Sequence, residues 1–372
     1  MKRFPWMIVA IVGSLFAASA CAGSDGQSVD PLGRLIALQE PIFPRANGID
    51  TWEVVVCRVP VGITDPMYAP INDRMSDDAS AIVDSLAPVS DYFDRWSGNR
   101  YDVRFVAAES EVSILTTETS EQCVERALAA SSPDAEGVLV VADAQHDVDQ
   151  EGGRGTPGTE CVAECSAKVT GRAVYVGAAD FMGDREAGVP LDLVEHELGH
   201  ALDWPHSGMS IGSLESGSYD SPYDLMSNSA ASWQSNPSLR DGPGILVVNL
   251  LSVGWITREQ VDVWSPRDRQ RSVNVVSRSS SNAEDPKMIV VPVDENSFFT
   301  LEFVSADGDD SFHTDDFVIA HRIEIRGGSG FDRRQFVVSP ELRPGDAWTT
   351  DDFEIRIESI DGTNATLTLT AR

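Results

Sequence analysis

Three histidines and one glutamate carry the clearest chemical signal in the chain. They form His196-Glu197-x-x-His200, and a third histidine, His206, follows six residues later. On a helix, His196 and His200 lie one turn apart and face the same way, so their imidazoles can bind one metal ion. Glu197 lies beside the first ligand, where its carboxylate can reach a metal-bound water and act as a general base.

His206 has to reach the ion from outside that helix, because Pro205 cannot occupy a helix interior. Three protein ligands leave one position of a tetrahedral zinc ion for water, which is typical of a catalytic site. A structural zinc site would need a fourth protein ligand, and the chain offers none at metal-ligand spacing. A surface helix that carries these residues by accident is the other interpretation. Only six histidines occur in 372 residues, however, so three at this spacing favour a metal site.

The helix that would position these ligands is predicted to begin near Pro190, since proline is favoured in the first turn of a helix. Apolar residues recur along it at helical spacing and would anchor one face in a core. They are Leu191, Val194, Leu198, Ala201 and Leu202. The histidine pair lies on a different face, which we expect to border a cleft.

Strands and helices alternate before this helix. Strands are predicted at 51–59, 101–107, 137–142 and 173–177, and helices at 73–96, with a bend at Pro88, and at 119–130. This order predicts an α/β domain at 50–260, in which helices pack on a mixed, mostly parallel sheet. Residues 150–168 are predicted to form a loop, because they contain Gly, Pro and Cys. The strand at 173–177 could form the rim of a substrate cleft or be a plain edge strand.

Helical spacing disappears after Val261. Strands are predicted at 272–276, 288–293, 298–304, 317–325, 335–338, 353–357 and 365–370. Their spacing predicts an all-β sandwich domain at 261–372, which could bind substrate or merely support the preceding domain. The acidic residues between Asp307 and Asp316 could bind Ca²⁺. They lack a regular calcium-loop spacing, so a solvated loop is the favoured interpretation.

Residues 1–20 are predicted to be an export signal. Lys2 and Arg3 precede a mostly apolar run, which ends in small residues before Cys21. This pattern resembles a bacterial lipoprotein signal, which implies a lipid on Cys21, a tether at 21–49 and a cell-surface location. Cleavage near Cys21 and full secretion are the alternative. The lipid would be the only membrane attachment, because no later run reaches membrane-spanning length.

The four other cysteines are Cys57, Cys123, Cys161 and Cys165. An even number in an exported chain indicates two disulfides, for which three pairings are open. Cys57–Cys123 together with Cys161–Cys165 is the favoured pairing. A metal clip formed by Cys161 and Cys165 is a weaker interpretation, because no second cysteine pair completes it.

The full histidine spacing resembles the zinc motif of metzincin metallopeptidases. That motif usually has glycine where this chain has Asp203, so the resemblance implies a positive φ there, which Asp tolerates better than most residues. Residues 219–227 resemble the metzincin Met-turn, in which Met226 would form an apolar floor beneath the zinc ion. No tyrosine stands two residues after Met226, where some metzincins have an extra ligand. Tyr223 could contact substrate, although a core role is favoured.

Residues 250–256 resemble the segment that closes the catalytic domain of gametolysin-like and immune-inhibitor-like secreted metallopeptidases, and the runs 298–303 and 317–323 fit later strands of that group. The resemblance implies a zinc-dependent endopeptidase with Glu197 as general base. A catalytically inactive, surface-anchored binding protein with the same fold is the alternative. The formal net charge of −31 argues against nucleic acid or anionic membrane as a partner. The expected partner is a protein or peptide substrate, and a monomer is expected.

Overall fold

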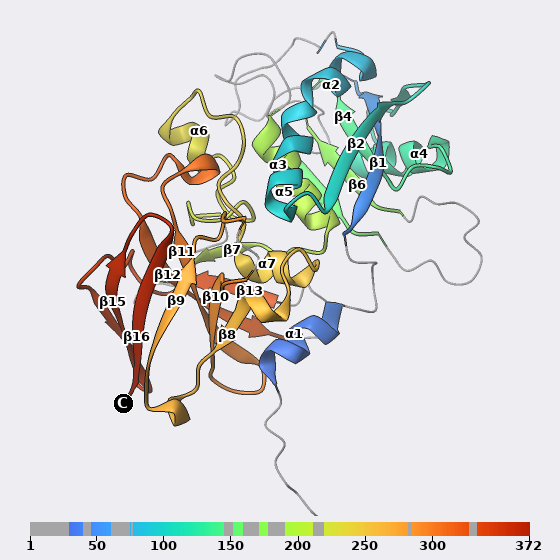
Figure 1. The fold of residues 1–372 in the computed structure, drawn as a ribbon. Helices are drawn as coiled ribbons and strands as arrows, with labels where there is room; N and C mark the ends of the chain where they lie inside the picture. Colours follow the sequence, from blue (N-terminus) through green and yellow to red (C-terminus); the bar gives the residue numbers. More distant parts are fainter. Residues whose placement is uncertain are drawn as a thin grey trace, which may run out of the picture.

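The computed structural model describes residues 30–39, 46–60, 75, 77–144, 152–158, 171–177, 190–210, 219–281, 284–326 and 333–372. The predicted export signal, Cys21, Cys161 and Cys165 lie outside these residues. The described chain is a mixed α/β protein with three sheets (Figure 1). Among its helices, none has the length and apolar character needed to cross a bilayer.

The first sheet has the strand order β2-β1-β4-β6-β5, and β3 also pairs with β1. These strands are β1 (Gly48–Arg58), β2 (Tyr101–Ala107), β3 (Val112–Ser113), β4 (Gly137–Ala142), β5 (Gly153–Thr156) and β6 (Ala173–Val176). All of the pairings are parallel except that of β5 with β6. Every residue of β4 is buried, as expected for a central parallel strand covered on both faces. The predicted mostly parallel sheet is therefore confirmed.

Helices cover both faces of this sheet. In chain order the α-helices are α1 (Pro31–Gln39), α2 (Ala79–Ser85), α3 (Ala87–Ser97), α4 (Ser120–Ala130), α5 (Leu191–Ala201), α6 (Ala231–Ser235) and α7 (Val247–Ser252). Alternate residues of β1 point to opposite faces: Val54 packs in one core with α3 and α5, and Val55 packs in another with α4. The helix that carries two of the predicted ligands is thereby fixed against the sheet.

The helix predicted at 73–96 is in fact two helices. Leu86 leaves the helical conformation between α2 and α3, with φ −91° and ψ 0°. Pro88 lies in the first turn of α3, where a missing N–H leaves no hydrogen bond unmade, so the chain starts a new helix instead of bending one. α3 ends one residue beyond the predicted range, and its C-cap Gly98 has a left-handed φ of 65°.

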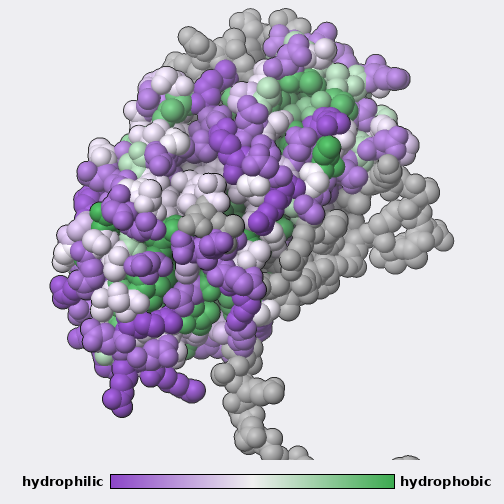
Figure 2. All heavy atoms as spheres, viewed as in Figure 1, coloured by the Kyte–Doolittle hydropathy of each residue, from purple (hydrophilic) through white to green (hydrophobic). Residues whose placement is uncertain are grey.

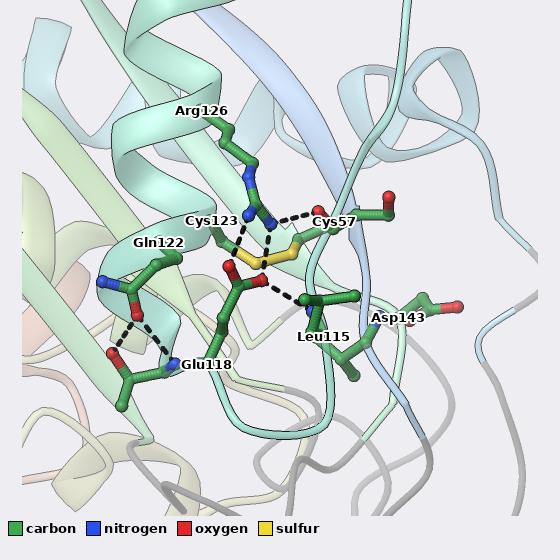
Figure 3. The surroundings of a disulfide bond; sticks show 10 residues. Cys57, Leu115, Glu118, Gln122, Cys123, Arg126 and Asp143 are labelled. Carbon is green, nitrogen blue, oxygen red and sulfur yellow. Dashed lines mark hydrogen bonds and ion pairs between the residues drawn. A yellow bond between two sulfur atoms is a disulfide. The ribbon is translucent and has the colours of Figure 1, made fainter.

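A disulfide between Cys57 and Cys123 joins β1 to α4, with 6.0 Å between the Cα atoms. Figure 3 shows this bond beside Arg126 of α4, whose guanidinium donates to both carboxylate oxygens of Glu118. The structure thus contains one of the two predicted pairings. The covalent tie fixes α4 on the face of the sheet opposite α5, whereas the ion pair joins α4 to the residue just before its N-cap.

Two predictions about the edge of the first sheet were wrong. Residues 150–168 were predicted to form a loop, but β5 lies within this range. The strand at 173–177 was predicted to be a cleft rim or an edge, but β6 lies between β4 and β5. Among the described strands, β5 is the outermost on this side of the sheet, and its Gly153 and Gly155 supply no apolar alternation from which a strand could be recognised.

The remaining strands form two sheets that pack face to face, as the predicted sandwich requires. The second sheet has the order β7-β13-β12-β11-β10-β8 and the third β14-β15-β16-β9. Their bounds are β7 (Ser207–Met209), β8 (Val261–Val263), β9 (Gln270–Val276), β10 (Met288–Pro292), β11 (Ser297–Val304), β12 (Phe317–Ile325), β13 (Arg333–Val337), β14 (Ala347–Thr349), β15 (Phe353–Ile360) and β16 (Asn364–Ala371). Apolar residues of both sheets, such as Leu301 and Leu367, share one core.

The sandwich is not isolated from the first part of the chain. Val290 and Ile323, on the other face of the second sheet, belong to the same core as Phe93 of α3 and Leu198 of α5. β7, which follows His206, also completes the second sheet. On the face seen in Figure 2, hydrophilic side chains dominate and apolar ones show in separate small groups, as expected for a chain of this charge.

Candidate metal centre

The structure brings the three predicted histidine ligands together. His196 and His200 project from α5, and His206 follows the turn after it. One ring nitrogen from each histidine lies within 4.8 Å of those of the other two. The ring centroids are 4.9 Å apart for His196 and His200, and 4.3 Å apart for His200 and His206. This group could hold a metal ion.

The turn that returns His206 to the site is built at the end of α5. Asp203 has φ 65°, which confirms the predicted left-handed residue. The N–H groups of Asp203 and Trp204 donate to the carbonyls of His200 and Gly199, at 2.9 and 3.0 Å. The Trp204 ring is fully buried against Trp255. The reversal is therefore held by backbone hydrogen bonds and by an aromatic anchor.

Backbone carbonyls orient the two helical ligands. His196 Nδ1 donates to the carbonyl of Leu225 at 2.7 Å, and His200 Nδ1 donates to the carbonyl of Trp204 at 2.8 Å. Because each Nδ1 carries the proton, each Nε2 presents a lone pair to the centre of the group. The sequence alone does not reveal these acceptors, since one of them lies 29 residues from its histidine.

Burial keeps the imidazoles neutral. It lowers the pKa of His196 well below the ordinary value, and the neighbouring His200 and His206 add to the effect. Burial and the adjacent His206 lower the pKa of His200 to about 4, and burial lowers the pKa of His206. Only a neutral imidazole can bind a metal ion, so all three residues are in the ligating form near pH 7.

Met226, the residue expected from the Met-turn resemblance, packs against α5, the helix that carries His196 and His200. Its side chain is fully buried, and a Cβ atom added to Gly199 would collide with Met226 Sδ. The carbonyl of Met226 accepts from Ser207 N at 2.9 Å, so the same residue also supports the strand that follows His206. Tyr223 instead packs against Phe317, in agreement with the core role favoured from the sequence.

Glu197 is buried on α5, directly beside the edge strand β5. A Cβ atom at Gly153 would collide with the carboxylate of Glu197, and one at Gly155 with its backbone carbonyl. Glycine is therefore required at position 155, where the clash is with backbone, and a larger residue at position 153 would force the Glu197 side chain to move. Glu197, the predicted general base, thus lies on α5 against β5, the last strand on this side of the described sheet.

One residue of the centre, Tyr219, was missed from the sequence. Its hydroxyl lies 2.9 Å from His206 Nε2, and its ring centroid lies 4.4 Å from that of His206. Burial raises the pKa of Tyr219, and the charge of Glu197 adds to the rise, so the phenol keeps its proton. The residue has a φ of 77° and lies at the start of the Met226 segment. Only its place in that segment could have suggested it.

The acidic stretch considered for Ca²⁺ makes other contacts. Asp309 accepts from Arg95 and from the indole of Trp96, and Asp310 pairs with Arg278. Within the described ranges, His196, His200 and His206 form the one group of three or more His, Cys, Asp or Glu side chains close enough to share a metal ion. These two carboxylates join the sandwich to α3 and to the centre of the molecule.

Comparison of the sequence with models of protein families and with curated proteins finds no match.

Proposed function

We propose that this chain is a zinc-dependent endopeptidase with a metzincin-like catalytic region related to the gametolysin-like and immune-inhibitor-like peptidases. The observation that carries the proposal is the convergence of His196, His200 and His206, with Glu197 beside them. Three neutral imidazoles suit zinc, and a three-histidine set is typical of catalytic zinc sites that keep an open position. A zinc ion bound there would activate water and polarise the scissile carbonyl.

Each polar residue of the centre has a role in this reaction. Glu197 accepts a proton from the attacking water and returns it to the leaving amine. The protonated hydroxyl of Tyr219, 2.9 Å from His206 Nε2, donates a hydrogen bond to the carbonyl oxygen as it gains negative charge. The carbonyls behind His196 and His200 keep both rings in place throughout.

The edge strand β5 supports a peptide as the substrate. In the described part of the sheet, β5 pairs with β6 on one side, and Glu197 lies close to its backbone. An extended peptide can add to such an edge through main-chain hydrogen bonds and so present its scissile bond to Glu197. β5 thus takes the rim role that the sequence had suggested for residues 173–177.

We also propose that the enzyme acts at the cell surface as a monomer anchored by a lipid on Cys21, with full secretion as the alternative. The disulfide between Cys57 and Cys123 supports an exported protein, because disulfides persist in oxidising compartments.

Digestion of casein by the purified protein tests the activity. We expect cleavage that a chelator abolishes and added zinc restores. Glu197→Gln should keep the metal and lower the rate by about 10²–10⁴-fold, because only the proton transfer is removed. Glu358→Gln, on the exposed side of β15, is the matched control and should cleave at the parent rate. Cleavage by Glu197→Gln at the parent rate would exclude Glu197 as the base, and no cleavage by the parent protein would favour the inactive binding protein.

A further inference from the structure

The third histidine ligand lies at the junction of two structural units. β7 begins at Ser207, the residue after His206, and pairs in parallel with β13 of the sandwich. Ser207 lies opposite Gln335, and Ser210 N donates to the carbonyl of Val337 at 2.8 Å. His196 and His200 are held by α5, but the backbone that follows His206 is held by a strand more than 120 residues further along the chain.

Gln335 also holds the residue before His206. Its side chain is fully buried, and its Nε2 donates to the carbonyl of Pro205 at 3.2 Å. Proline has no N–H, so this carbonyl is the only backbone hydrogen-bonding group of Pro205. Gln335 therefore fixes the peptide unit that leads into His206, while the β7–β13 ladder fixes the peptide units that leave it.

Arg333 orients Gln335 from two positions earlier on the same strand. Arg333 Nε donates to Gln335 Oε1 at 3.3 Å, and Arg333 Nη2 donates to Asn249 Oδ1 of α7 at 2.5 Å. The guanidinium is almost fully buried, and burial lowers its pKa to about 10, while the charge of Asp203 acts in the opposite direction. Asp203 is the left-handed residue of the turn before His206.

Hydrogen bonds to Asp224 also hold the backbone that follows His206. Ser207 Oγ donates to Asp224 Oδ2 at 2.5 Å, and Asp224 Oδ1 accepts from Leu246 N at 3.2 Å. Both carboxylate oxygens of Asp224 are thus used to join β7 to the start of α7. The backbone on each side of His206 is held by buried polar groups from outside α5.

We propose that the C-terminal sandwich is a structural part of the metal centre, in which Gln335 and Arg333 of β13 are positioning residues for His206. The inference rests on the histidine group being a metal site, as in the proposed function, but not on any peptidase activity. Groups behind a metal ligand commonly change metal affinity 10–100-fold when they are removed. The sequence left open whether the sandwich binds substrate or supports the preceding domain, and the geometry assigns it a third role.

Titration of the full chain with Co²⁺ alone, followed by visible absorption, tests the proposal. Gln335→Met removes both polar atoms and keeps the side-chain length, so we expect Co²⁺ affinity to fall about 10–100-fold. Leu367→Ala is the matched control, because Leu367 is fully buried between the second and third sheets and its loss destabilises the sandwich without touching β13. Urea unfolding of both variants in chelator measures the shared loss of stability.

The proposal would be supported if Gln335→Met and Leu367→Ala lost the same stability but only Gln335→Met bound Co²⁺ more weakly. Parent-like affinity in a folded Gln335→Met variant would overturn it, as would an equal loss of affinity in Leu367→Ala. If Gln335→Met does not fold, Gln335→Asn keeps the amide but is one methylene too short for Pro205, and the same comparison applies. Failure of the parent chain to bind Co²⁺ would remove the metal site itself and with it the proposed function.

Discussion

Two clusters of buried polar side chains, Arg278 with Asp310 and the three histidines, differ in how their polar atoms are paired. Arg278 is fully buried and donates to both oxygens of Asp310, at 2.9 and 2.6 Å, and to the carbonyl of Tyr223 at 2.7 Å. Asp310 also accepts from Gly244 N at 3.0 Å. The histidine group instead brings like groups together, with only 2.7 Å between the Nε2 atoms of His200 and His206.

Arg278 and Asp310 form a structural clamp, whereas His196, His200 and His206 form a site that a ligand can fill. A buried charge pair with hydrogen bonds on both members is complete in itself, and it joins the sandwich to the rest of the molecule. Converging imidazole lone pairs are not complementary to one another and become favourable when a cation lies between them. In the acidic stretch considered for Ca²⁺, Asp309 and Asp310 likewise have protein cations as partners.

Removal of a ligand should break the site and leave the clamp intact. For His206→Ala we expect Co²⁺ affinity to fall by more than about 100-fold and peptide cleavage to disappear, because two imidazoles no longer define a three-ligand site. The free energy of unfolding in chelator should change by less than about 1 kcal/mol, since the half-buried imidazole carries no charge there. Metal titration and urea unfolding measure the two effects. A variant that loses stability but keeps the metal would reverse the assignment.

Removal of the arginine should have the opposite outcome. Arg278→Met leaves Asp310 buried without its cation, so we expect a loss of about 3–5 kcal/mol in the free energy of unfolding. Co²⁺ affinity of the folded fraction should match the parent. Arg278→Met combined with Asp310→Leu should recover part of the loss, because no unpaired charge remains. If the single variant weakened Co²⁺ binding tenfold, the clamp and the site would not be separate.

The parts of this molecule that could be predicted from sequence are those fixed by neighbouring residues. His196 and His200 share a helix face because they are four positions apart, and the left-handed Asp203 follows from the resemblance of this short segment to the metzincin zinc motif. Most sandwich strands were recognised from apolar alternation, which is also local. Metal-site geometry was predictable to the extent that one short segment supplies its ligands.

The parts that were missed depend on contacts between distant segments. β5 carries glycines because Glu197 lies against it, and the resulting lack of side chains hides the strand. β7 is three residues long and owes its conformation to its pairing with β13. The paired residues Ser207 and Gln335 are 128 positions apart in the sequence. Tyr219 reaches His206 from a turn with a positive φ, which no local pattern predicts for tyrosine.

The histidine group and the Arg278–Asp310 pair also differ in their response to pH, because imidazoles titrate in a range where the Arg278 guanidinium stays charged. In metal-free unfolded chains His200 binds a proton below about pH 6.5, but in the folded protein its pKa is about 4. The unfolded state therefore binds more protons between these values, and stability falls as pH falls through this window. Between pH 7 and pH 5 we expect His200 to account for a loss of about 2 kcal/mol.

Urea unfolding in chelator at both pH values measures this contribution. His200→Leu should remove about 2 kcal/mol of the pH dependence, and Arg278→Met should leave that dependence unchanged. If the free energy of unfolding depended on pH in the same way in His200→Leu and in the parent, folding would not lower the pKa of His200.

The smallest effect concerns Tyr219, which has no counterpart in the clamp. Tyr219→Phe removes only the hydroxyl that lies 2.9 Å from His206 Nε2, so Co²⁺ affinity should remain within about twofold of the parent. If the phenol stabilises the developing oxyanion, kcat for peptide cleavage should fall about 10-fold with KM unchanged, because the interaction forms mainly in the transition state. Tyr223→Phe is the matched control: its hydroxyl donates to Glu341 at 3.1 Å, away from the histidines, and the rate should not change. A lower Co²⁺ affinity for Tyr219→Phe would instead make the phenol a fourth ligand, and equal kcat values for both variants would remove it from the reaction.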